Sequence, residues 1–213
     1  NPEKDLTRIG LVASAPLVLV VAADSPYKTL ADVVAAAKAR PEALNYASSG
    51  SGTVAHLATE LFQKTANVRF THVPYKGAAQ GATDLIGGQV QMYMSSVPTL
   101  IGHIKNGKMR PIVVTSRKRT TDLPDAPTVD ESGYKGFEAA TWFGVAGPAG
   151  LPKEVVAKPT AAFNKALQDP EVKRKLASQG AEVKGSTPEE FGAYIREETV
   201  RWGKVVKESG AKV

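Results

Sequence analysis

"NYASSGSGTVAHLATELF", residues 45–62, joins a short apolar strand pattern to an amphipathic helix through a Gly/Ser loop. Its last nine residues keep apolar side chains at helical spacing, which predicts a helix from Thr53 to about Thr65. A loop of this kind leaves backbone N–H groups exposed at the start of the helix, where anions bind well. The stretch therefore predicts an α/β fold that carries an anion-binding loop.

The same strand–loop–helix alternation extends in both directions along the chain. Strand patterns occupy 16–22, 43–48, 68–75, 89–95 and 109–116, and helical patterns occupy 29–40, 53–65, 77–88 and 97–108. Thr29 and Asp32 predict a capping box at the start of the first of these helices. Alternation of this kind is typical of βαβ units and a parallel sheet. The Val-rich run at 16–22 is almost continuously apolar, which predicts a strand covered on both faces.

The pattern changes after residue 116. Residues 115–136 are rich in turn formers. The pattern at 137–150 predicts an extended segment that passes from one structural body to another. Helices are expected after the caps Asp169 and Thr187, while Pro159 should kink or restart the helix before them. The last helix carries an apolar stripe that needs a partner surface. Its members are Phe191, Tyr194, Ile195, Trp202, Val205 and Val206.

Composition narrows the class of protein. The 213 residues are 42% hydrophobic, carry a formal net charge of +6 and include no cysteine. Basic residues are interleaved with acidic ones and lack aromatic partners, so nucleic acid is not an expected ligand. The absence of cysteine excludes thiolate sites and fits an oxidising compartment. The longest apolar run, 15–23, is too short to span a bilayer, and we expect a soluble protein.

A phosphate-binding interpretation stays open. Residues 50–55 match the G-x-G-x-x-[GA] fingerprint and lie between a strand and a helix. The acidic residue that would bind a ribose is absent from the end of the next strand, where the chain has Val73, Pro74, Tyr75 and Lys76. The alternative function is thus the dinucleotide-binding domain of an oxidoreductase that uses Gly50 and Gly52.

Catalytic and metal-binding patterns are weaker. The three histidines, His56, His72 and His103, lack metal-ligand spacing, and no nucleophile elbow occurs. His56 lies one turn into its helix, where it either faces a ligand or is a hydrogen-bonded structural residue. We expect the other two to be structural. The sequence predicts no enzyme, no metal and no cofactor.

A carboxylate-binding site requires fewer features than a nucleotide-binding or catalytic site. Glycines let the backbone approach the anion, and Ser/Thr hydroxyls add donors. A second loop, 73–79, repeats the design, and a third strand end adds two serines to the same rim. The candidate ligand-binding residues are Ser49, Gly50, Ser51, Gly52, Thr53, His56, Pro74, Tyr75, Lys76, Gly77, Ser95 and Ser96.

The stretches at 45–62 and 71–94, together with those at 108–133, 141–156 and 186–210, resemble the periplasmic solute receptors of tripartite tricarboxylate transporters, the Bordetella uptake gene (Bug) family. They follow family order and cover essentially the whole chain. The resemblance implies a periplasmic binding protein type II-like (Venus flytrap) fold, with two α/β domains joined by a hinge. It also implies a periplasmic monomer that captures a small carboxylate and delivers it to a membrane permease.

The resemblance also implies a domain organisation. Domain two, the complete ligand-binding half, would span 17–136, and domain one would comprise 1–16 and 137–213. The two crossings between them would place hinge residues at Ala15, Pro16, Trp142 and Phe143. The family's N-terminal part is absent from this chain, so we expect domain one to be incomplete here.

The ligand itself stays open among dicarboxylates, tricarboxylates, aromatic acids and amino acids. The family often carries an acidic residue after the strand at 89–95, where this chain has Ser95 and Ser96. Loss of that negative charge should disfavour an ammonium group and favour a plain carboxylate.

Overall fold

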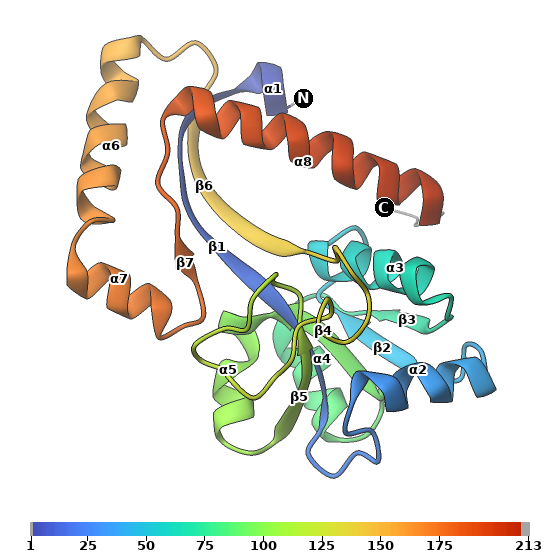
Figure 1. Ribbon diagram of the computed structural model, residues 1–213. Coiled ribbons are helices and arrows are strands. Elements are labelled where there is room, and N and C mark those ends of the chain that lie inside the picture. The colour runs from blue at the N-terminus through green and yellow to red at the C-terminus, as the bar shows by residue number, and fades with distance from the viewer. Residues whose placement is uncertain (1, 210–213) are drawn as a thin grey trace. The chain divides into compact units, whose positions relative to one another are not determined.

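The computed structural model describes residues 2–209, with side chains from residue 4 onward (Figure 1). The chain forms two compact units. Unit 1 contains the residues up to Ala15 together with Trp142–Gly203, and unit 2 contains Pro16–Thr141 together with the residues from Lys204 onward. The chain passes from one unit to the other at Ala15/Pro16, at Thr141/Trp142 and again at Gly203/Lys204. Each unit is described by itself below.

Unit 2 contains the sheet that positions the Gly/Ser loop. In chain order its elements are the second half of β1 (Leu6–Ala22), α2 (Leu30–Ala39), β2 (Asn45–Ser48), α3 (Val54–Ala66), β3 (Thr71–Pro74), α4 (Ala78–Ile86), β4 (Met92–Ser96), α5 (Val97–Lys105) and β5 (Met109–Val114). The strand order is β3-β2-β4-β1-β5. Strand β2 runs parallel to both β3 and β4.

The direction of β1 differs from the prediction of an all-parallel sheet. Strand β1 runs antiparallel to both β4 and β5, so the sheet is mixed. Its residues Leu17, Val18 and Val20 are fully buried, as the apolar run predicted. The prediction of direction was wrong because two-sided burial produces the same apolar pattern whichever way a strand runs. The strand is also longer than the run at 16–22, since it begins at Leu6.

Helices α4 and α5 pack on the sheet of unit 2 through a continuous apolar cluster. Leu85 of α4 and Leu100 of α5 are fully buried against Tyr93 of β4 and Val18 of β1. Gly81 lets α4 approach closely, because a Cβ there would lie 3.4 Å from Cζ of Tyr93. This packing fixes the ends of the strands from which the loops emerge.

Residues 115–139, all described, form turns without a named helix or strand, in agreement with the turn-rich sequence. Thr115 joins this segment to the sheet. Its Oγ1 accepts the N–H of Leu17 at 2.8 Å and donates to the carbonyl of Ala139 at 2.6 Å. The segment thereby closes over the sheet beside β5.

Unit 1 contains α1 (Pro2–Asp5), the first half of β1, most of β6 (Ala140–Pro148), α6 (Lys153–Ala166), α7 (Pro170–Ala177), β7 (Glu182–Val183) and α8 (Pro188–Ser209) as far as Gly203. Strands β6 and β7 both pair with β1. Trp142 of β6 packs edge-on against Phe191 and Tyr194 of α8, with ring centroids 5.7 and 5.8 Å apart. The apolar stripe of α8 is thus partly covered within this unit, and Phe191 is buried.

The predicted helix starts are confirmed. Thr29 and Asp32 form a capping box, and Asp169 accepts the N–H groups of Glu171 and Val172. Helix α8 begins with reciprocal bonds between Thr187 and Glu190. These caps are local, so the sequence alone locates them.

The expected restart at Pro159 does not occur, since α6 is one helix from Lys153 to Ala166. Proline removes the N–H that would bond to the carbonyl of Val155, but that residue is exposed, so water can bond to its carbonyl. On the other side, Thr160 Oγ1 donates to the carbonyls of Val156 and Ile9, both at 2.9 Å. Packing on β1 therefore holds the helix together across the proline.

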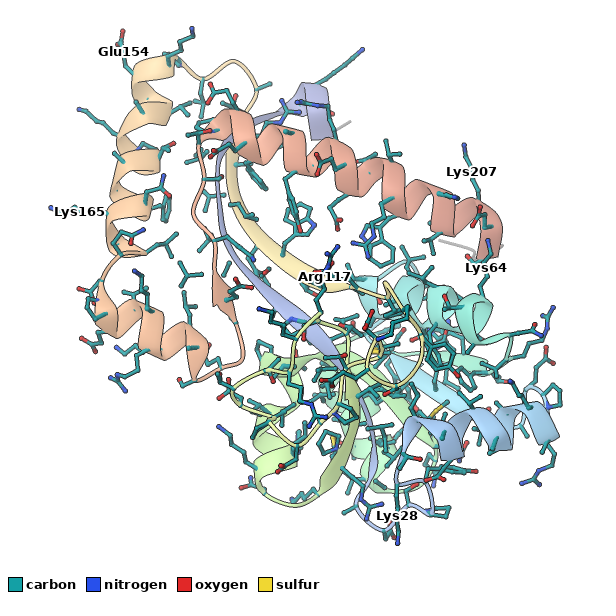
Figure 2. The ribbon with its side chains drawn as sticks, in the orientation of Figure 1. Lys28, Lys64, Arg117, Glu154, Lys165 and Lys207 are labelled. Carbon is teal, nitrogen blue, oxygen red and sulfur yellow. The ribbon has the colours of Figure 1, made fainter. Side chains whose placement is uncertain are left out.

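Charged side chains lie at the surface of both units. Figure 2 shows Glu154 and Lys165 pointing away from α6, and Lys28 pointing away from unit 2. Arg117 pairs with Glu138 at 2.6 Å. No helix among the described residues has the length and apolar character needed to cross a bilayer.

Candidate functional site

Three strand ends gather at one edge of the sheet in unit 2. Ser48 of β2 lies in register with Pro74 of β3, and Tyr46 of β2 lies in register with Met92 of β4. Because the three strands are parallel to one another, the loops that follow them begin at the same edge. The sequence predicted this gathering from the repeated design of the loops.

The first loop connects Ser48 to α3 and is shaped by two glycines with positive φ. Gly50 has φ +139° and Gly52 has φ +75°, a region that L side chains rarely adopt. Thr53 is the N-cap of α3, with its Oγ1 donating to the carbonyl of Gly50 at 2.8 Å and accepting the N–H of His56. The loop is therefore held by its own hydrogen bonds.

The hydroxyl groups of this loop have different surroundings. The Thr53 hydroxyl is engaged by the loop, and Ser48 Oγ accepts the N–H of Gly50 at 3.2 Å. Ser51 is exposed and Ser49 is half-buried, so both remain accessible from solvent. The start of α3 carries the partial positive charge of a helix N-terminus. An anion at this edge would meet that charge together with serine donors.

The second loop follows β3. Tyr75 is buried, its N–H donates to the carbonyl of Ser48 at 3.0 Å, and its hydroxyl donates to Asp84 at 2.8 Å. Burial, followed by this hydrogen bond, raises the pKa of Tyr75 to about 12. Lys76 is exposed, and Gly77 (φ +151°) precedes α4. Tyr75 thus links the two loops through its backbone, while its hydroxyl anchors α4.

The third strand end is that of β4. Ser95 is buried, and Ser96 is the N-cap residue of α5, with its Oγ 2.7 Å from Oγ1 of Thr99. Neither serine carries a charge. The edge therefore offers hydroxyl and amide groups, with Lys76 as the nearby cation on the second loop.

Histidine side chains lie directly behind the first loop. His56 is 5% exposed, and its Nδ1 accepts the N–H of Gly52 at 3.0 Å. His72 Nε2 lies 2.7 Å from Ser48 Oγ, and the two imidazole rings are stacked with centroids 4.0 Å apart. Of the two roles open for His56, the geometry favours the structural one, because its ring bonds to the loop backbone.

The sequence did not predict the contacts of Ser48 and His72 behind the first loop, because these depend on strand register. Ser48 was not a candidate, and His72 was expected to be structural with no partner named. His72 lies beside Tyr46 in the β2–β3 ladder, and those two rings are also stacked. Period-two alternation places Tyr46 and Ser48 on the same face of β2, but only the pairing register brings His72 to them.

A cavity of about 920 Å³ lies elsewhere, within unit 1, between α1, α6 and the start of α8. Its lining includes Arg8, Lys153 and Arg196, and none of its lining residues belongs to the three loops. The predicted site is instead an edge of unit 2. Among the described residues, no group of three or more His, Asp or Glu side chains is placed to hold a metal ion.

Comparison with known proteins identifies relatives along the full chain. The family model described as "Tripartite tricarboxylate transporter family receptor" matches residues 1–211. Protein BugT of Bordetella pertussis is 36% identical over 210 residues, which make up 99% of this chain and 64% of that protein. The chain thus spans less than two thirds of the length of this curated relative.

Two solved structures with bound ligands share the fold. The R. palustris protein Rpa4515 with adipate is 35% identical, with a TM-score of 0.94, and the match covers 99% of this chain and 71% of that one. MatC (Rpa3494) from Rhodopseudomonas palustris with bound malate is 30% identical, with a TM-score of 0.87, over 97% of this chain and 71% of that one. Adipate and malate are both dicarboxylates.

Proposed function

The chain belongs to the tripartite tricarboxylate transporter receptor family, and we propose on that premise that the protein is a periplasmic receptor that captures a small carboxylate for a membrane permease. One observation carries the proposal. Three parallel strand ends bring a glycine/serine loop, a helix N-terminus and a lysine-bearing loop to one edge of unit 2. Such an edge suits an anion with several acceptor oxygens.

We assign ligand capture to domain two, residues 17–136. The backbone N–H groups of the first loop and the hydroxyls of Ser49 and Ser51 would bond to a carboxylate. Pro74, Tyr75 and Gly77 would form the wall of the pocket through the second loop. Lys76, which is exposed, would raise the local positive potential and attract the anion.

Hinge bending would complete the capture. The chain passes between the units beside Ala15, Pro16, Trp142 and Phe143, and these are the proposed hinge residues. Trp142 packs against α8 within unit 1, and Phe143 is 47% exposed. Closure of a second domain over the edge would exclude water from the bound carboxylate and strengthen its hydrogen bonds.

The proposed ligand class is a dicarboxylate without an ammonium group. Ser95 and Ser96 supply no negative charge at the end of β4 that could pair with a ligand ammonium. The adipate and malate in the two related structures belong to the same chemical class. Tighter binding of aspartate than of malate would contradict this assignment.

The test is titration calorimetry of the protein with adipate, malate, aspartate and NAD⁺. The proposal predicts binding of adipate or malate, weaker binding of aspartate and none of NAD⁺. Binding of NAD⁺ alone would restore the dinucleotide alternative. Native mass spectrometry of protein purified from its own source would then identify the physiological ligand and show whether the protein is monomeric.

A further inference from the structure

Two stacked histidines support the first loop from the side of the sheet. The rings of His56 on α3 and His72 on β3 lie nearly parallel, at an interplanar angle of 9°. Tyr46 of β2 stacks on His72, with a centroid separation of 4.8 Å. The two imidazoles are in van der Waals contact, and both carry nitrogens that can gain a proton. Their position behind the first loop therefore suggests a role beyond packing.

Each histidine holds a different end of the loop. His72 Nε2 bonds to Ser48 Oγ, which in turn accepts the N–H of Gly50. At the other end, the Gly52 N–H donates to Nδ1 of His56. The loop between Ser48 and Gly52 is therefore fixed on both sides by side chains from two separate elements.

The bond from Gly52 depends on the protonation state of His56. Nδ1 can accept a hydrogen bond only while it carries no proton, so the neutral ring must have its hydrogen on Nε2. A proton on Nδ1 would place two donors against each other and leave the Gly52 N–H without its partner. A charge on either ring would also repel a charge on the other at 4.0 Å.

The other titratable groups that face the pair are Glu60 on α3 and Tyr46 on β2. Glu60 Oε1 lies 3.8 Å from Nε2 of His56 and accepts the Tyr46 hydroxyl at 2.9 Å. Burial lowers the pKa of His56 despite the carboxylate of Glu60. Burial, and then the charge of His56, lowers the pKa of His72 to about 4. Both rings are thus neutral at neutral pH.

We propose that His56 and His72 are positioning residues of the carboxylate site: the neutral stacked pair holds the loop in its binding shape, and acidification releases the loop. Release of the loop follows from the geometry of unit 2. Weaker capture of a carboxylate on acidification rests in addition on the proposed function. The two consequences are therefore measured separately.

The first measurement is NMR of the uniformly ¹⁵N-labelled protein without ligand, from pH 7.5 to pH 4.5. The imidazole nitrogens should show His56 with its hydrogen on Nε2 at pH 7.5. The Gly52 amide resonance should move with the first of the two imidazoles to titrate, and its hydrogen exchange, corrected for pH, should accelerate. A Gly52 amide that stays unchanged while the His56 ring titrates would overturn the proposal.

The second measurement is calorimetry with adipate over the same pH range. One linked proton weakens binding by up to about tenfold for each pH unit below the pKa of the free protein's pair. The double variant His56→Asn/His72→Gln keeps an acceptor near each nitrogen but cannot titrate, so its affinity, whatever its value at pH 7.5, should be flat with pH. His103→Gln, a change on α5 outside the pair, should keep the pH dependence of the wild type.

The two measurements distinguish the possible failures. If adipate and malate do not bind at pH 7.5 but the Gly52 amide follows the imidazoles, the ligand assignment fails and the positioning role stands. If adipate binds equally at pH 7.5 and pH 4.5 while the His56 ring becomes protonated, the positioning role is refuted and the receptor function stands. Circular dichroism shows whether the double variant folds. The wild-type NMR titration decides if it does not.

Discussion

Gly52 is the residue at which loop shape and ligand binding should be most tightly connected. Its φ of +75° disfavours any side chain, and its N–H bonds to His56. The variant Gly52→Ala should lose about 1 kcal/mol of stability, the usual penalty for an L residue in the left-handed region. We also expect it to bind adipate about tenfold more weakly, a loss of about 1.4 kcal/mol, because displaced loop amides would lose hydrogen bonds to the carboxylate.

The matched control for this change is Gly88→Ala. Gly88 follows α4, has the same φ of +75°, and would carry a Cβ with no atom within 4 Å. It should therefore lose a similar amount of stability in urea denaturation and keep its affinity for adipate. Equal loss of affinity in both variants would show that the effect of Gly52→Ala comes from general destabilisation.

At the scale of elements, Thr115 joins β5 to β1 and to the end of the turn-rich segment. Its hydroxyl is fully buried and serves Leu17 and Ala139 at once. Thr115→Val keeps the shape but leaves a buried N–H and a buried carbonyl unsatisfied, which should cost about 1–3 kcal/mol. Thr115→Ser keeps the hydroxyl and should lose clearly less. Equal losses in urea denaturation would mean that packing of the methyl group contributes as much as the hydrogen bonds do.

The contact between β6 and α8, which lies in unit 1, provides a second test at the scale of elements. A Cβ on Gly144 would come within van der Waals overlap of the Phe191 ring, with its nearest atom at 2.1 Å. Gly144→Ala should therefore destabilise the protein by about 1–3 kcal/mol through overpacking. Adding Phe191→Leu should restore part of that loss, since the shorter side chain leaves room. Gly102→Ala on α5 meets no atom within 4 Å and should be neutral or stabilising.

Elements with local signals were predictable, and long-range pairings were not. The capping residues Thr29, Asp169 and Thr187 each act within one helical turn, so the sequence located those helix starts. The antiparallel direction of β1 and the position of His72 behind the loop depend on which strands pair and in what register. Apolar periodicity reports burial and carries no information about a strand's neighbour. For the same reason the glycine loop was predicted while its histidine support was not.

At the scale of the whole molecule, acid should lower stability in a pH window set by the histidine pair. In an unfolded chain a histidine has a pKa near 6.5, and folding lowers the pKa of His72 to about 4. Between these values the unfolded state binds more protons than the folded state. The stability contributed by neutral His72 is therefore complete above about pH 6.5, falls as the pH drops towards 4, and changes no further below that. His56, whose pKa is also lowered, acts in the same direction.

Urea denaturation at pH 7.5, 6.0, 5.0 and 4.5 measures this loss. The limiting slope for one proton is about 1.4 kcal/mol per pH unit. Because His72 is partly exposed, we expect a total of about 1–2 kcal/mol between pH 6.5 and 4.5. Carboxylates with lowered pKa, such as Asp130 and Glu131, contribute their losses mainly below their ordinary values of 3.8 and 4.5, so they overlap little with this window. The variant His72→Gln should show a shallower slope than the wild type in this window, because only His56 of the pair still titrates. An equal slope in both proteins would show that protonation of His72 does not contribute to the pH dependence of stability and that acid acts on other groups.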